Sequence, residues 1–166
     1  MNETTIKVKE IIKGLGYKRN QVSVKTSKYA VCNTSITVTI KDISINAENL
    51  ESKLNHLEKI RVDCMGEFLE GCNTYIHVNY DYETLKDASQ SKIGICEMLL
   101  KEVEESKSSV WVDDNWSLMW NPSANAYCLF HKNYLNENSG IYRNKYIRSA
   151  QELAREFTIK SAQNIW

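Results

Sequence analysis

The fold is decided by residues 35–60, which read SITVTIKDISINAENLESKLNHLEKI. In the first six positions apolar and polar residues alternate, as in a strand with one buried face, the apolar ones being Ile36, Val38 and Ile40. After Asn46 the apolar residues recur every three or four positions, as in an amphipathic helix, at Ala47, Leu50, Leu54, Leu57 and Ile60. The stretch therefore predicts a β-strand followed by a helix, which indicates an α+β fold.

The flanking residues complete a first lobe over residues 1–80. Upstream, Thr5 is expected to cap a helix that ends near Leu15, and residues 21–26 alternate like a strand that pairs antiparallel with residues 35–40. Downstream, residues 74–80 are rich in Tyr, Ile and Val, which favour strands. We therefore expect the order α-β-β-α-β with an antiparallel sheet.

The rest of the chain predicts a linking helix and a second, smaller lobe. Residues 81–107 have apolar positions on one helical face, and Gly94 weakens the middle of that helix. Residues 108–166 begin with three short aromatic strands, expected at 109–112, 117–120 and 126–131. Ser149 and Glu152 have the spacing of a capping box, so the aromatic meander is expected to be closed by a helix.

Composition and charge exclude several classes of protein. Hydrophobic residues make up 42% of the 166 residues, which is too many for a disordered chain. The 21 basic and 21 acidic residues cancel, so the chain as a whole is neither a polybasic nucleic-acid binder nor an acidic DNA mimic. No apolar run reaches the length of a signal peptide or a membrane span, and five cysteines without framework spacing are typical of free thiols. We therefore expect a cytoplasmic protein that does not enter a membrane.

Residues 5–80 resemble a family of phages and conjugative elements, the twenty-ninth of the large polyvalent protein-associated domain families. The resemblance rests on short patterns, which are Leu15-Gly16-Tyr17, Val22-Ser23-Val24-Lys25, Ser35-Ile36-Thr37-Val38, Gly71-Cys72-Asn73-Thr74-Tyr75-Ile76-His77-Val78 and Tyr80-Asp81. It implies a mobile-element origin and an accessory role. It supplies no active site, and it does not extend to the aromatic second half.

The motifs that signal metal binding or catalysis are missing from the sequence. No CxxC, HxxxH or HExxH occurs, and the best candidate ligands, Cys64, Cys72 and His77, are not closely paired. Cys128 and His131 are three apart in a predicted strand, where side chains at that spacing point to opposite faces. No glycine-rich phosphate loop follows a strand. We therefore predict a protein that is not an enzyme, with no catalytic residues, no bound metal and no cofactor.

Aromatic residues are concentrated in the second half, and two interpretations of them stay open. They are either the core of the small lobe or an exposed surface, because Trp, Tyr and Arg are enriched at binding hot spots. The segment 142–148 interleaves rings with cations, which suits a protein interface or stacking on bases. The candidate binding residues are Trp116, Tyr142, Arg143, Lys145, Tyr146 and Arg148.

These observations favour a protein that acts by binding. The hypothesis is a phage or mobile-element accessory protein that inhibits a host defence complex stoichiometrically, such as a CRISPR nuclease, with a host protein or ribonucleoprotein as its partner. The alternative is an accessory factor that binds nucleic acid through the segment 142–148. An enzyme with an unrecognised site is the third hypothesis.

Overall fold

The computed structural model describes residues 2–29, 32–69, 71–112, 115–131 and 145–163. It is an α+β protein in which the chain divides into two compact units, Met1–Thr84 and Leu85–Trp166. Each unit has its own sheet and its own cluster of buried apolar residues.

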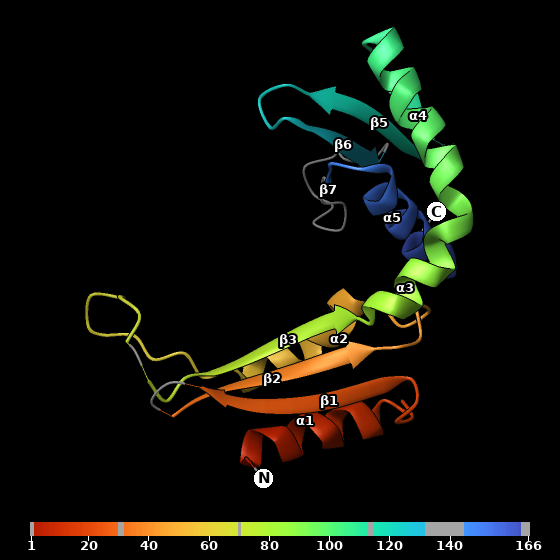
Figure 1. Cartoon of the computed structure of the whole chain (residues 1–166). Helices are drawn as coiled ribbons and strands as arrows, with labels where there is room; N and C mark the ends of the chain where they lie inside the picture. The colour runs from red at the N-terminus through yellow and green to blue at the C-terminus, as the bar shows by residue number, and fades with distance from the viewer. Residues whose placement is uncertain (1, 30–31, 70, 113–114, 132–144, 164–166) are drawn as a thin grey trace. The chain divides into compact units, whose positions relative to one another are not determined.

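The first unit has the element order α-β-β-α-β (Figure 1). Its elements are α1 (Glu3–Gly14), β1 (Val22–Tyr29), β2 (Asn33–Ile40), α2 (Ala47–Leu54), the 3-10 turn η1 (Asn55–Leu57) and β3 (Thr74–Tyr80). The sheet order is β1-β2-β3, with β1 antiparallel to β2. The predicted antiparallel sheet is wrong for β3, which runs parallel to β2 because the crossover through α2 returns the chain to the end of the sheet where β2 begins.

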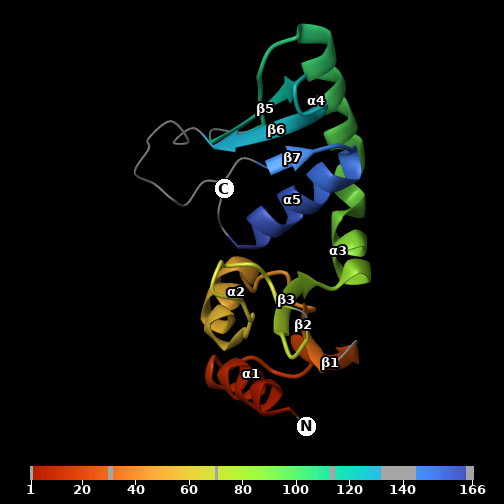
Figure 2. The same ribbon diagram turned by 90° about the vertical axis from the view of Figure 1, so that its left-hand side faces the viewer.

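The core of the first unit lies between the sheet and its helices. Figure 2 shows α1 and α2 on the same side of this sheet. Along β2 every second residue is buried, which fits one face packed on helices and one face open. The buried apolar residues are Val8, Ile12, Val22, Ile36, Val38, Ile40, Ile45, Leu50, Leu54 and Ile76.

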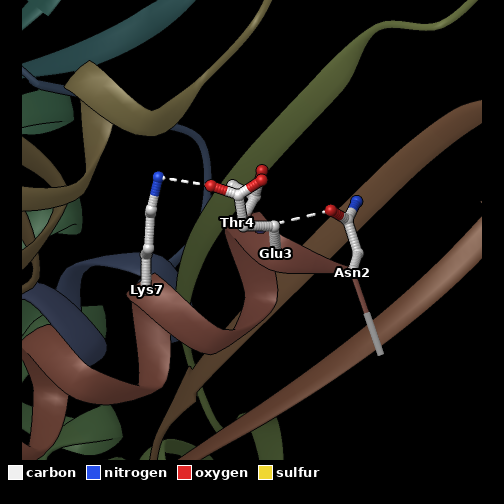
Figure 3. A network of polar contacts seen from close by, with 4 residues as sticks. All are labelled: Asn2, Glu3, Thr4 and Lys7. Carbon is white, nitrogen blue, oxygen red and sulfur yellow. Dashed lines mark hydrogen bonds and ion pairs between the residues drawn. The ribbon is translucent and has the colours of Figure 1, made fainter.

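An asparagine side chain caps the first helix of this unit and another caps the second, and the predicted cap of the first helix was wrong. Helix α1 begins three residues earlier than expected, because the Asn2 side chain accepts a hydrogen bond from the Thr4 backbone N–H at 3.2 Å (Figure 3). The expected cap, Thr5, is instead buried inside the helix, where its hydroxyl lies 3.0 Å from that of Thr26. Asn46, which the sequence analysis placed just before the second helix, caps α2, with 2.8 Å from its side-chain oxygen to the Asn49 N–H.

The second unit is built on a four-stranded antiparallel sheet of order β4-β5-β6-β7. Its strands are β4 (Val110–Trp111), β5 (Trp116–Asn121), β6 (Ala126–His131) and β7 (Lys145–Ile147). Strand β7 was not expected, since the sequence analysis assigned its residues to a binding segment. The segment expected as one linking helix forms α3 (Tyr82–Ser89), the turn η2 (Gln90–Lys92) and α4 (Ile93–Ser106).

Helices α4 and α5 (Ala150–Ala162) supply the helical side of the second core. Helix α4 contributes Cys96 and Val103, so it belongs to this unit's core instead of standing apart as a linker. The Ser149 side chain accepts from the Glu152 N–H at 3.2 Å, which confirms the predicted cap of α5. The other buried members of the core are Trp116, Leu118, Tyr127, Leu129, Ile147, Ala150, Leu153, Ala154 and Phe157.

A disulfide joins Cys32 to Cys72, so the expectation that all the cysteines are free thiols is wrong. The parallel register of β2 and β3 pairs Thr34 with Thr74, and the two cysteines each precede one of these threonines by two residues. The bond therefore ties together the starts of two neighbouring strands. Because disulfides are rare in a reducing cytosol, the cytoplasmic location stays a prediction.

None of the described helices has the length and apolar character that a membrane crossing requires.

Candidate functional site

A groove of about 1110 Å³ opens in the second unit. It lies between the C-terminal end of α4, the β5–β6 hairpin and the residue that follows β7. Its lining combines apolar side chains with a few charged and hydroxyl groups, which is the usual make-up of a ligand site. The lining residues are Val103, Glu104, Lys107, Ser108, Ser109, Met119, Trp120, Pro122, Ala124, Asn125, Tyr127 and Arg148.

The tryptophan of this groove is Trp120, whereas the predicted binding residue Trp116 belongs to the core. Trp116 is only 3% exposed, and the Lys160 ammonium lies 4.0 Å from the centroid of its ring. The candidate role of Trp116 in binding is therefore wrong, because a partner cannot reach a ring covered in this way. Trp120 is four residues further along β5, on the same face of the strand, and is 39% exposed.

Tyr127 and Glu104 form the polar centre of the groove. The Tyr127 hydroxyl donates a hydrogen bond to the Glu104 carboxylate, which joins β6 to α4. The Tyr127 ring packs edge-on against Trp120, with 4.9 Å between ring centroids and 66° between planes. Burial raises the pKa of Tyr127 to about 12, and the hydrogen bond to the nearby carboxylate adds to the rise. The phenol therefore stays protonated near neutral pH and fixes the orientation of the ring.

Two cations, Lys107 and Arg148, also line the groove. Lys107 ends α4 in the left-handed conformation, with φ of 52°, and its N–H donates to the Val103 carbonyl at 3.0 Å. The Arg148 backbone N–H donates to Glu152 at 2.7 Å, which fixes the backbone at the end of β7. Neither side chain forms an ion pair with another residue of the described part of the chain. Both charges are therefore available to an acidic ligand.

The structure brings only one of the predicted binding residues to the groove, which is Arg148. Tyr142 and Arg143 lie outside the described residues. Lys145 forms an ion pair with Glu156 of α5, and so contributes to holding β7 on that helix. Tyr146 is half exposed, but it pairs with Cys128 and alternates with Ile147, which places it on the other face of the sheet.

Four residues of the groove were not predicted as binding residues from the sequence, namely Glu104, Lys107, Trp120 and Tyr127. Alternation along β5 and β6 indicates that Trp120 and Tyr127 share a face of the sheet. It does not indicate where α4 ends, and this end decides which part of that face stays exposed. The weighed metal candidates do not form a site either. Cys72 is bonded to Cys32, and no three His, Cys, Asp or Glu residues are grouped to hold an ion in the part of the chain that the structure describes.

Compared with protein-family models, curated proteins and solved structures, the chain matches none.

Replacing Tyr127 with Phe is expected to remove a group that titrates near pH 12. Because the folded protein holds this proton more tightly than the unfolded chain, whose tyrosine has a pKa of 10.0, Tyr127 contributes stability that is present below pH 10 and is lost as the pH rises toward about 12. Tyrosinate absorbance against pH measures the titration. Glu104→Gln should lower the pKa of Tyr127 only part of the way, since burial is the larger cause. Identical alkaline curves for the wild type and Tyr127→Phe would contradict the assignment.

Proposed function

We propose that this protein acts by binding a partner protein, and that the groove of the second unit takes an acidic and apolar segment of that partner. The single observation that carries the proposal is the exposed Trp120 ring beside Lys107 and Arg148 in one groove. A ring of this size can bury 150–250 Å² in a partner, and Trp and Arg are the residue types most enriched at hot spots.

The local structure supports a preformed site. Trp120 and Tyr127 are paired neighbours in the β5–β6 register, and the Tyr127 hydrogen bond to Glu104 joins this pair to α4. A groove whose rings are already oriented loses less conformational entropy when a ligand binds. Lys107 and Arg148 would pair with carboxylates of the partner, while Met119 and Val103 offer apolar contact.

The more specific form of the proposal is that the partner is a host defence complex, such as a CRISPR nuclease, which this protein inhibits stoichiometrically. Its support is the resemblance of residues 5–80 to domains of phages and conjugative elements and the small size of the chain. An inhibitor of this kind would act at one-to-one stoichiometry, whereas an enzyme would inactivate many targets per molecule.

A nucleic-acid ligand is the second candidate, because rings beside cations also suit stacked bases and phosphates. Salt separates the two candidates. Binding to phosphates weakens steeply as ionic strength rises, whereas a hot-spot protein interface weakens less.

Reversing both groove charges, Lys107→Glu with Arg148→Glu, is expected to weaken partner binding thirtyfold to a thousandfold. Losing a hot-spot contact costs about 2 to 4 kcal/mol, and the new carboxylates would also repel an acidic partner. Capture from a nuclease-treated extract of host cells identifies the partner, and titration with the purified partner then gives the Kd. Folding should be preserved, because substitutions at such exposed positions change stability by less than about 0.5 kcal/mol.

The matched control is Lys25→Glu with Lys53→Glu, which changes the net charge equally at exposed positions of the first unit. This control should bind like the wild type. If the groove variant binds the partner as tightly as the control does, the groove is not the binding site. If nuclease treatment removes the captured species, the ligand is a nucleic acid and the protein-binding proposal is wrong.

A further inference from the structure

Three strongly exposed apolar residues of the first unit lie at the end of one hairpin, to which residues 58–69 and 71–73 belong, between η1 and β3. In Figure 1 this yellow segment extends past the ends of β2 and β3. Met65 is 83% exposed, Phe68 77% and Val62 52%. We call residues 62–69 the hairpin tip. A cluster of exposed large apolar side chains on a soluble surface marks a site of interaction.

Hydrogen bonds hold the hairpin tip in a defined shape. The Asp63 carboxylate accepts from the backbone N–H groups of Met65 and Glu67, each at 2.8 Å. The Asp63 N–H donates to the Glu67 carbonyl at 2.9 Å, and Val62 bridges to Phe68. The apolar side chains are therefore presented by an ordered turn.

The base of the hairpin is fixed to the sheet. The buried Asn73 side chain accepts from the Arg61 N–H and donates to the Leu69 carbonyl, both at 2.8 Å, while Lys59 and Thr74 exchange two backbone hydrogen bonds. Cys72, next to Asn73, is tied to Cys32 by the disulfide. Because both sides of its base are held, the hairpin should lose little conformational entropy when its tip binds a partner.

The chemistry of the hairpin tip complements the groove of the second unit. The tip combines the apolar Val62, Met65 and Phe68 with the carboxylates of Asp63 and Glu67. The groove combines the exposed Trp120 ring with the cations Lys107 and Arg148. The hairpin tip is thus an acidic and apolar segment, which is the kind of ligand that the proposed function assigns to the groove.

We propose that the hairpin tip of one copy of this protein docks in the groove of a second copy. The proposal rests on the proposed function in using the same groove, and it names one segment that fits it. The two surfaces differ, so the contact is head-to-tail, and a pair of copies still has one free hairpin tip and one free groove. Association therefore continues beyond a dimer as concentration rises, unless the chain of copies closes into a ring.

Sedimentation equilibrium of the purified protein, up to about 1 mM, tests the proposal, because it detects self-association with a Kd as weak as about 1 mM. The wild type is expected to show an average mass that rises with concentration. Phe68→Asp and the double variant Lys107→Glu with Arg148→Glu should each sediment as monomers. Met98→Asp, which places the same charge at another exposed apolar position on α4, should associate like the wild type.

Mixing the two monomeric variants gives the decisive result. The Phe68→Asp protein keeps its groove and the groove variant keeps its hairpin, so the mixture should form a one-to-one dimer and nothing larger. A monomeric wild type, a mixture that does not associate, or association that neither variant weakens would each overturn the proposal. Flotation of the wild type with anionic lipid vesicles, lost in Phe68→Asp, would instead assign the hairpin tip to a membrane.

The same variants keep this proposal separate from the proposed function. Phe68→Asp leaves the groove intact, so it should lose self-association and still capture the partner. If partner capture is insensitive to the groove charges while self-association depends on them, the proposed function fails and the head-to-tail contact stands.

Discussion

Removing the disulfide between Cys32 and Cys72 is expected to lower the free energy of unfolding of the first unit by about 4 kcal/mol. The bond joins residues separated by 40 positions, and closing a loop of that length restricts the unfolded chain by about this amount. Most small domains have a total stability of only 5–15 kcal/mol, so the loss is large. The variant Cys32→Ser with Cys72→Ser tests it in urea unfolding.

The location of the tryptophans makes the measurement specific. All four, Trp111, Trp116, Trp120 and Trp166, belong to the second unit. Circular dichroism reports on both units, whereas tryptophan fluorescence reports on the second. The variant should therefore shift the dichroism transition and leave the fluorescence transition in place. Cys64→Ser, which removes an exposed free thiol, is the control and should shift neither. An unchanged dichroism transition in the disulfide variant would contradict the prediction.

Truncating Leu153 to Ala is expected to destabilise the second unit by about 2 to 5 kcal/mol. Leu153 is fully buried where α5 packs on the sheet, so the substitution removes apolar contacts and leaves a cavity. The fluorescence transition in urea should move to lower denaturant concentration. The matched variant is Leu50→Ala in α2, which is 1% exposed in the first core.

The two leucine variants also test how the chain divides. Leu50→Ala should shift the dichroism transition of the first unit and leave the fluorescence transition in place, because the contacts of Leu50 lie in the first unit. If each variant shifts both signals by the same amount, the two units unfold in one cooperative transition, and the prediction that the two cores unfold independently is wrong.

Much of the fold could be predicted because local signals decide where its elements begin. Ser149 caps its helix as expected, since a Ser side chain satisfies N–H groups that the helix leaves without partners, and the helix predicted after Asn46 begins at Ala47. The alternation of Ile36, Val38 and Ile40 gave the buried face of β2 correctly. Thr5 misled the prediction because Asn2, three residues earlier, is a better cap than Thr and starts the helix sooner.

The errors concern contacts between residues distant in sequence. The direction of β3 could have been inferred from its order, because a strand joined to its neighbour through a helix usually returns parallel. Once β2 and β3 are parallel, the equal offset of Cys32 and Cys72 from Thr34 and Thr74 favours their pairing. The disulfide was not predicted, because five cysteines without regular spacing are typical of free thiols.

The candidate site was harder to predict, because burial depends on where the helices end. Trp116 and Trp120 have the same residue type and lie on the same face of β5. One is covered by the core and Lys160, whereas the other lies beside the end of α4 and stays half exposed. No pattern along the chain distinguishes them.

The state of the five cysteines allows the hairpin tip to be labelled chemically. Cys32 and Cys72 form the disulfide, and the thiols of Cys96 and Cys128 are buried. Burial also raises the pKa of the Cys96 thiol to about 11, which lowers its reactivity further. Cys64, in the hairpin tip, is the one exposed free thiol. A maleimide dye or spin label added to the unaltered protein should therefore attach at Cys64, so that the native sequence already carries an addressable reporter beside Met65.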